Sequence, residues 1–128
     1  MGGCVSVVVD ASSLAALIFG EPAADLVAAR LSGHKLAAPS IMPCELANVA
    51  AVKVRRGSIG AAHADESLHF ADSMGIEIHT IGSTVMFEAA LATGLSAYDA
   101  AYWILARALT ADLVTLDGEL ERATRRPR

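Results

Sequence analysis

A short, almost continuous run of valines near the start of the chain does most to limit the folds that this sequence can adopt. Residues 5–9 are all valine except Ser6, which is typical of a strand buried on both of its faces. Such strands occur almost only in parallel sheets that helices cover on both sides. The remainder of the chain is therefore expected to supply further strands and the helices that connect them.

Short strand-like runs alternate with longer helical stretches along the chain. The apolar pattern predicts strands at residues 5–9, 35–38, 76–81 and 113–116. It predicts helices at residues 12–19, 21–31, 40–57, 58–74, 83–94, 97–110 and 118–123, with Ser40, Ser58, Ser83 and Ser96 as N-cap residues. We therefore predict one α/β domain over residues 1–128, with a central, mostly parallel sheet and helices on both of its faces.

Four carboxylates interrupt this apolar pattern. Asp10 ends the first predicted strand, and Asp117 follows the last one. Glu45 and Asp99 lie in predicted helices among apolar neighbours, and no Lys or Arg is adjacent to any of the four in sequence. Charges in apolar surroundings are costly unless they are paired or bound to metal, so these acids are the first candidates for functional residues.

The predicted topology brings the four acids to one edge of the sheet. Ligands of open parallel sheets bind at the carboxyl ends of the strands, where Asp10 and Asp117 both fall. Glu45 and Asp99 are expected in the first turns of helices whose N-terminal ends face the same edge. Converging carboxylates repel one another, and a divalent cation is the simplest remedy. This arrangement suggests metal-dependent chemistry on a phosphate ester.

Each acid also has an ordinary structural interpretation. Asp10 and Asp117 could each cap the helix that follows, and Asp99 with Ser96 has the form of a capping box. Glu45 has apolar neighbours on both sides and would need a buried partner instead. A purely structural role for all four acids together is less expected than such a role for any one of them.

Four segments, in order, resemble the motifs of the PIN-domain ribonucleases, and specifically of the VapC toxins of bacterial toxin–antitoxin pairs. They are residues 7–14, 43–48, 95–102 and 113–117, so the resemblance spans essentially the whole chain. It implies a three-layer PIN-like fold, an acidic pocket that holds Mg²⁺ or Mn²⁺, and endonucleolytic cleavage of RNA.

The resemblance also assigns roles to individual residues. Carried over motif by motif, the catalytic and metal-binding acids are Asp10, Glu45, Asp99 and Asp117, and the supporting polar residues are Ser12, Asn48 and Thr115. A metal held by Asp10 and Asp99 would activate a water molecule for attack on the scissile phosphorus. A second metal near Glu45 and Asp117 remains an alternative to a single ion.

The charge of the chain bears on its partners. Nucleic-acid binders are usually basic, whereas this chain has a formal net charge of −4. The four acids account for that charge by themselves, and two bound Mg²⁺ ions would offset it. Basic residues also gather at 53–56 and near the C-terminus. Beyond RNA, the resemblance implies a cognate VapB-type antitoxin and a homodimer.

Two alternative functions share parts of this pattern. The first is a catalytically inactive PIN-like module for protein interaction, which would not need all four acids. The second is a phosphotransfer receiver domain, but the chain lacks a second Asp beside Asp10 and a Lys after the last predicted strand.

Several other classes are disfavoured by composition. No apolar run approaches the roughly 20 residues that span a bilayer, and residues 1–4 contain no basic leader, so we expect a cytoplasmic protein. The four histidines form no ligand pair and are predicted at the surface or at its boundary with the core. Cys4 and Cys44 match no zinc-binding spacing and are predicted to be reduced, buried thiols.

Overall fold

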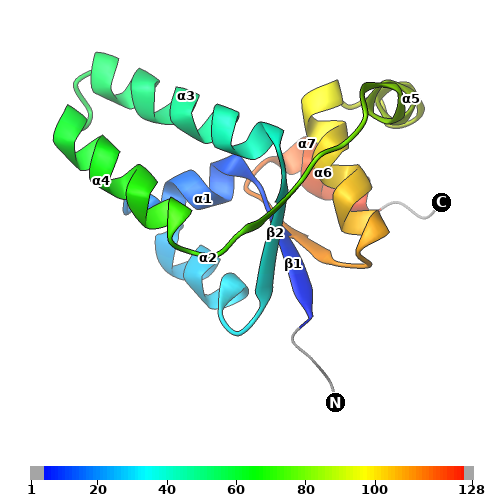
Figure 1. Ribbon diagram of the computed structural model, residues 1–128, viewed down its shortest axis with the longest axis horizontal. Coiled ribbons are helices and arrows are strands. Elements are labelled where there is room, and N and C mark those ends of the chain that lie inside the picture. The colour runs from blue at the N-terminus through cyan, green and yellow to red at the C-terminus, as the bar shows by residue number, and fades with distance from the viewer. Residues whose placement is uncertain (1–4, 126–128) are drawn as a thin grey trace.

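A single four-stranded parallel sheet forms the centre of the computed structural model, which describes residues 5–125 (Figure 1). Its strands are β1 (Ser6–Val9), β2 (Lys35–Pro39), β3 (Glu77–His79) and β4 (Asp112–Val114), arranged in the order β3-β2-β1-β4. All three neighbouring pairs are parallel. The valine-rich β1 is therefore an inner strand, as its composition predicts.

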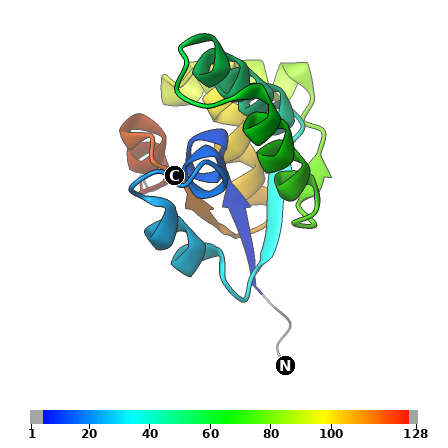
Figure 2. The same ribbon diagram turned by 90° about the vertical axis from the view of Figure 1, so that its left-hand side faces the viewer.

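The helices cover both faces of this sheet. They are α1 (Ala11–Ile18), α2 (Ala24–Leu31), α3 (Ile41–Arg55), α4 (Ala61–Asp72), α5 (Ser83–Thr93), α6 (Ala97–Ala108) and α7 (Gly118–Arg125). Helices α1 to α4 pack together on one side, whereas α6 covers the other side and contacts α5 and α7 (Figures 1 and 2). The predicted three-layer α/β fold is thus confirmed.

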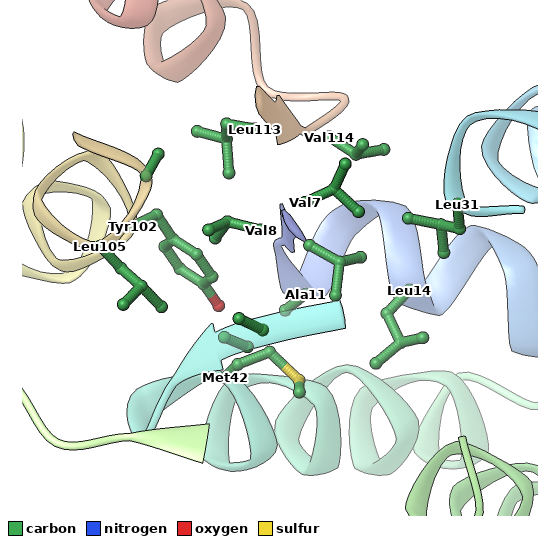
Figure 3. Close-up of a cluster of buried hydrophobic side chains, with 14 of the residues drawn as sticks. Val7, Val8, Ala11, Leu14, Leu31, Met42, Tyr102, Leu105, Leu113 and Val114 are labelled. Carbon is green, nitrogen blue, oxygen red and sulfur yellow. The ribbon is translucent and has the colours of Figure 1, made fainter. Parts of the chain in front are cut away.

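The core lies where the two helical layers meet the sheet (Figure 3). Val7, Val8 and Val9 are all buried, although successive side chains of a strand point to opposite faces. Leu14 and Met42 pack against β1 and β2 from one helical layer, and Tyr102 and Leu105 of α6 project from the other (Figure 3). Burial on both faces explains why β1 tolerates an almost unbroken apolar run.

The ends of some elements differ from the predictions. The strand predicted at 76–81 is reduced to Glu77–His79, because β3 is an edge strand and its neighbour, β2, ends at Pro39, which pairs with His79. Helix α4 begins after Gly60 rather than after Ser58, since the chain first turns through Gly57, which has a φ of +75°. Gly82, not Ser83, is the N-cap residue of α5.

The two remaining serine caps differ from each other. Ser96 caps α6 by accepting a hydrogen bond of 3.1 Å from the Asp99 backbone N–H. Ser40 does precede α3, but its backbone is already helical and its side chain makes no capping hydrogen bond.

Cys44 corrects another prediction, because this residue is exposed in the first turn of α3 rather than buried. Cys4 lies outside the described residues. Of the four histidines, three are exposed and His79 is half-buried, as predicted. Within residues 5–125, no helix combines the length and the apolar character that spanning a membrane requires.

Candidate acidic site

Asp10 is the most firmly held of the four acids. It follows β1 directly, is only 3% exposed, and serves as the N-cap residue of α1. Its Oδ1 accepts hydrogen bonds from the Ser12 hydroxyl at 2.8 Å and from the Ser13 backbone N–H at 2.9 Å. Its Oδ2 accepts a hydrogen bond from the Thr115 hydroxyl. Three donors therefore stabilise a buried carboxylate that forms no ion pair with any residue between 5 and 125.

The hydroxyls of Ser12 and Thr115 fix the direction of these bonds. Ser12 Oγ also accepts a hydrogen bond from the Leu116 N–H at 3.1 Å, and Thr115 Oγ1 accepts one from the Asp117 N–H at 2.9 Å. Each hydroxyl is thereby left to donate its proton to Asp10. Two of the three residues predicted to support the site thus connect the end of β1 to the segment that follows β4.

Asp117 lies at the end of that segment and caps α7. Its Oδ1 accepts hydrogen bonds from the backbone N–H groups of Glu119 at 2.9 Å and Leu120 at 3.2 Å. The structural and the functional interpretations of this residue are therefore compatible, since both bonds use one carboxylate oxygen and the residue is only half-buried.

The pKa of Asp99 depends on the charges of the other acids in the cluster. Burial raises its pKa to about 6, and the negative charges of Asp117, Glu45, Asp10 and Glu119 add to that increase. Asp99 lies in the first turn of α6, as predicted, so the fold does bring the acids of four separate segments within electrostatic reach. Glu119, which sequence reasoning did not single out, contributes from α7.

Glu45 has a polar partner that the sequence did not reveal. It lies in the second turn of α3, not the first as predicted, and its Oε1 accepts a hydrogen bond of 2.6 Å from the Tyr102 hydroxyl. Burial and the charge of Asp10 raise the pKa of Glu45, although the bond from Tyr102 opposes the rise. The only available signal was spacing, because Tyr102 lies three residues after Asp99 and so shares its face of α6.

Glu45 in turn affects the pKa of Tyr102. Its ring is buried between α6 and the sheet, with the hydroxyl oxygen directed toward β2 and α3 (Figure 3). Burial, followed by the hydrogen bond and charge of Glu45, raises the pKa of this phenol, so it stays protonated and remains a donor at any physiological pH.

Positive side chains do not neutralise the cluster. The ion pairs between residues 5 and 125 join Lys53 to Glu21 and Arg125 to Glu121, together with two His–carboxylate pairs at His69 and His79. None of them involves the four predicted acids. Like-charge repulsion therefore persists among these carboxylates and favours a bound cation.

The donor chemistry fits a hard divalent ion, because every candidate ligand is a carboxylate or hydroxyl oxygen. The side chains do not form a closed cage: in the part of the chain described, no three His, Cys, Asp or Glu side chains lie close enough together to hold an ion. Mg²⁺ is commonly held by only one or two carboxylates and retains several waters. An open, partly hydrated site is thus the arrangement that these residues fit.

Asn48 remains apart from these contacts. It is exposed on α3, three residues after Glu45, and its supporting role stays a prediction.

Comparisons with known proteins agree with the fold. The PIN-domain family model matches residues 7–126. The crystal structure of PAE2754 from Pyrobaculum aerophilum is similar, with 27% sequence identity, a TM-score of 0.76, and coverage of 94% of this chain and 81% of that one. Mycobacterium tuberculosis VapC20, described as a sarcin-ricin loop cleaving toxin, shares the fold at 19% identity and a TM-score of 0.68, covering 94% of this chain and 99% of that one. No curated protein sequence matches significantly.

Proposed function

Because this chain belongs to the PIN-domain family, we propose that it is a metal-dependent endoribonuclease and the toxin of a VapBC-type toxin–antitoxin pair. One observation carries the catalytic part of the proposal. Four segments contribute carboxylates to one edge of the sheet, where their mutual repulsion helps to raise the pKa of Asp99 to about 6 and no ion pair among the described residues relieves it. A structural role alone gives no reason to maintain that repulsion.

A bound Mg²⁺ or Mn²⁺ would lower the pKa of a water molecule and offset charge on the phosphate. The protein's own residues do the positioning. Asp10 supplies a carboxylate whose orientation is fixed by hydrogen bonds from Ser12, Ser13 and Thr115. Tyr102 orients Glu45 in the same manner from α6.

The remaining task is to accept the proton of the attacking water. Glu45 has a raised pKa, which makes it a better proton acceptor than an ordinary carboxylate, whereas Asp99 would share the ion with Asp10. Asp117 completes the acidic edge, with one carboxylate oxygen engaged by the backbone of α7.

The proposed partners follow from the same assignment. Besides RNA, they are a VapB-type antitoxin and a second copy of the chain, all of which would be met in the cytoplasm. Exposed apolar residues support the protein contacts: Phe87 and Leu91 lie one turn apart on α5 and are 60% and 73% exposed, and Phe70 is exposed on α4. Such groups of apolar side chains mark interaction surfaces.

The open spacing of the acids among the described residues favours one alternative, a PIN-like module that binds proteins without cleaving RNA. A cleavage assay separates the two functions. Wild-type protein with Mg²⁺ or Mn²⁺ should cut single-stranded RNA, and Asp99→Asn or a chelator should abolish cutting. Asp112→Asn is the matched control, because Asp112 is an exposed acid at the opposite end of β4.

Each outcome has a distinct meaning. Cleavage by Asp112→Asn but not by Asp99→Asn supports the nuclease. Equal cleavage by wild type and Asp99→Asn points to a contaminating enzyme. No cleavage with either metal, in protein that still binds a partner chain, supports the interaction module.

A further inference from the structure

An apolar pocket of about 370 Å³ lies beside the acidic cluster. Its walls come from the junction of β2 with α3, from α5 and its approach, and from the first turns of α6. The residues that matter here are Pro39, Ser40, Cys44, Ile81, Met86 and Tyr98. No charged side chain from the described part of the chain lines it, so it suits a neutral, largely apolar group rather than a phosphate.

The pocket shares its walls with the acidic site. Cys44 immediately precedes Glu45 on α3, and Tyr98 immediately precedes Asp99 on α6. Consecutive residues of a helix point about 100° apart, so the two surfaces are neighbours and not one cavity. A polymer with one group seated in the pocket can therefore continue past the carboxylates.

We propose that this pocket binds one unstacked nucleobase of a single-stranded RNA, next to the phosphate that faces the acids, with Tyr98 as its stacking wall. The proposal rests on the proposed nuclease function and names its substrate contact. Proteins that read single-stranded RNA stack bases on aromatic side chains and hydrogen-bond their edges. Tyr98 is 61% exposed, so its ring is accessible to such a base.

Polar groups for the edge of the base are also present. The Ser40 side chain makes no capping hydrogen bond to α3, which leaves its hydroxyl to face a ligand. The Cys44 thiol is exposed on the adjoining wall. These two small polar groups would hydrogen-bond to the polar edge of a base, while the apolar walls of the pocket would contact its ring.

A protein side chain is the less favoured occupant. The more exposed apolar residues of α5, Phe87 and Leu91, do not line this pocket. Met86 of the pocket directly precedes Phe87, so the partner surface adjoins the pocket, but only the pocket also adjoins the acids.

Cleavage kinetics provide the first test. Tyr98→Ala should raise KM about tenfold or more, the size of a lost base–aromatic stack, with kcat nearly unchanged because uniform binding is what is removed. Tyr98→Phe should behave as wild type. Leu26→Ala is the control, because Leu26 on α2 is as exposed as Tyr98, at 61%, and does not line the pocket. An unchanged KM in Tyr98→Ala, or an equal loss in Leu26→Ala, overturns the proposal.

Protection of Cys44 provides a readout that does not depend on activity. The chain has two cysteines, so Cys4→Ser leaves Cys44 as the sole thiol, and Asp99→Asn prevents cleavage of the probe. A single-stranded RNA oligonucleotide of random sequence should slow the reaction of iodoacetamide with Cys44. An abasic oligonucleotide of the same length should not.

The outcomes distinguish the two proposals. Protection of Cys44 in this variant, together with no cleavage of RNA by the wild type, supports the base pocket and rejects the nuclease. If Tyr98→Ala cleaves RNA with an unchanged KM, the base pocket is rejected and the proposed nuclease function stands. Equal protection by abasic RNA, or protection that grows with protein concentration in the absence of RNA, shows that the backbone or a second copy covers Cys44 and overturns the base pocket.

Discussion

The Tyr102 hydroxyl donates a 2.6 Å hydrogen bond to Oε1 of Glu45, between residues 57 positions apart in the chain. The bond joins α6 to α3, which belong to the two opposite helical layers (Figure 1). It gives a half-buried carboxylate its partner and fixes the direction in which Glu45 points.

Tyr102→Phe removes this donor and changes little else in volume. We expect a loss of about 1.5 kcal/mol of unfolding free energy, at the lower end for a hydrogen bond to a charged group because Glu45 is partly exposed. The pKa of Glu45 should rise further, so the acidic limb of the cleavage pH profile should move to higher pH. Denaturant titration and pH-dependent kinetics measure both effects. Tyr98→Phe, an exposed phenol, should change neither; a Tyr102→Phe protein with wild-type stability and pH profile would contradict the assigned role.

Asp10→Asn and Asp99→Asn should both abolish cleavage but differ in stability. The amide that Asp10→Asn introduces would face the Ser12 and Thr115 hydroxyls, whose protons already point inward. We expect Asp10→Asn to lose about 1–3 kcal/mol, the cost of an unsatisfied buried group. Asp99→Asn removes a carboxylate that burial and neighbouring charges disfavour, and should unfold no more easily than wild type. Thermal denaturation in a chelator compares the two variants, and the reverse order would refute this account of the site.

The stability of the metal-free protein should depend on pH through Asp99. Its folded pKa of about 6 lies above the ordinary value of 3.8, so the folded state binds a proton more readily than the unfolded state does. The penalty for its charge is therefore fully present above pH 6 and disappears as the pH falls toward 4. Relative to Asp99→Asn, the wild type should gain stability over that range. A difference in melting temperature between the two proteins that is constant from pH 8 to pH 4 would contradict the shift.

Divalent ions should stabilise the folded protein, because only the folded chain presents the acids together. By linkage, an ion at 100 times its dissociation constant adds about 2.7 kcal/mol. Titration with Mg²⁺ or Mn²⁺ should raise the melting temperature of wild type and of Asp112→Asn, and have little effect on Asp99→Asn. Equal shifts in all three proteins would indicate a nonspecific salt effect.

The general architecture could be predicted from the sequence because it depends on local patterns. The unbroken apolar run of β1 requires burial on both faces, and that requirement leads to the parallel sheet and its helical layers. Motif positions point to Thr115 and Ser12, and the structure places both on the carboxylate of Asp10.

Other features depend on how distant elements meet. The partnership of Tyr102 with Glu45 requires α6 to lie across the sheet from α3, which no local pattern encodes. The exposure of Cys44 depends on which side of α3 the pocket leaves open. The short β3 reflects where its neighbour β2 ends.

The bonds between Asp10 and Thr115 and between Ser12 and Leu116 connect the first strand and helix of the chain to the segment that follows the last strand. Residues up to Leu109 can complete α6, but Asp10 then still lacks its donor from beyond β4. The third donor to this carboxylate arrives only when that later segment has joined the sheet beside β1. A nascent chain that stops short of β4 therefore presents Asp10 with an incomplete set of donors.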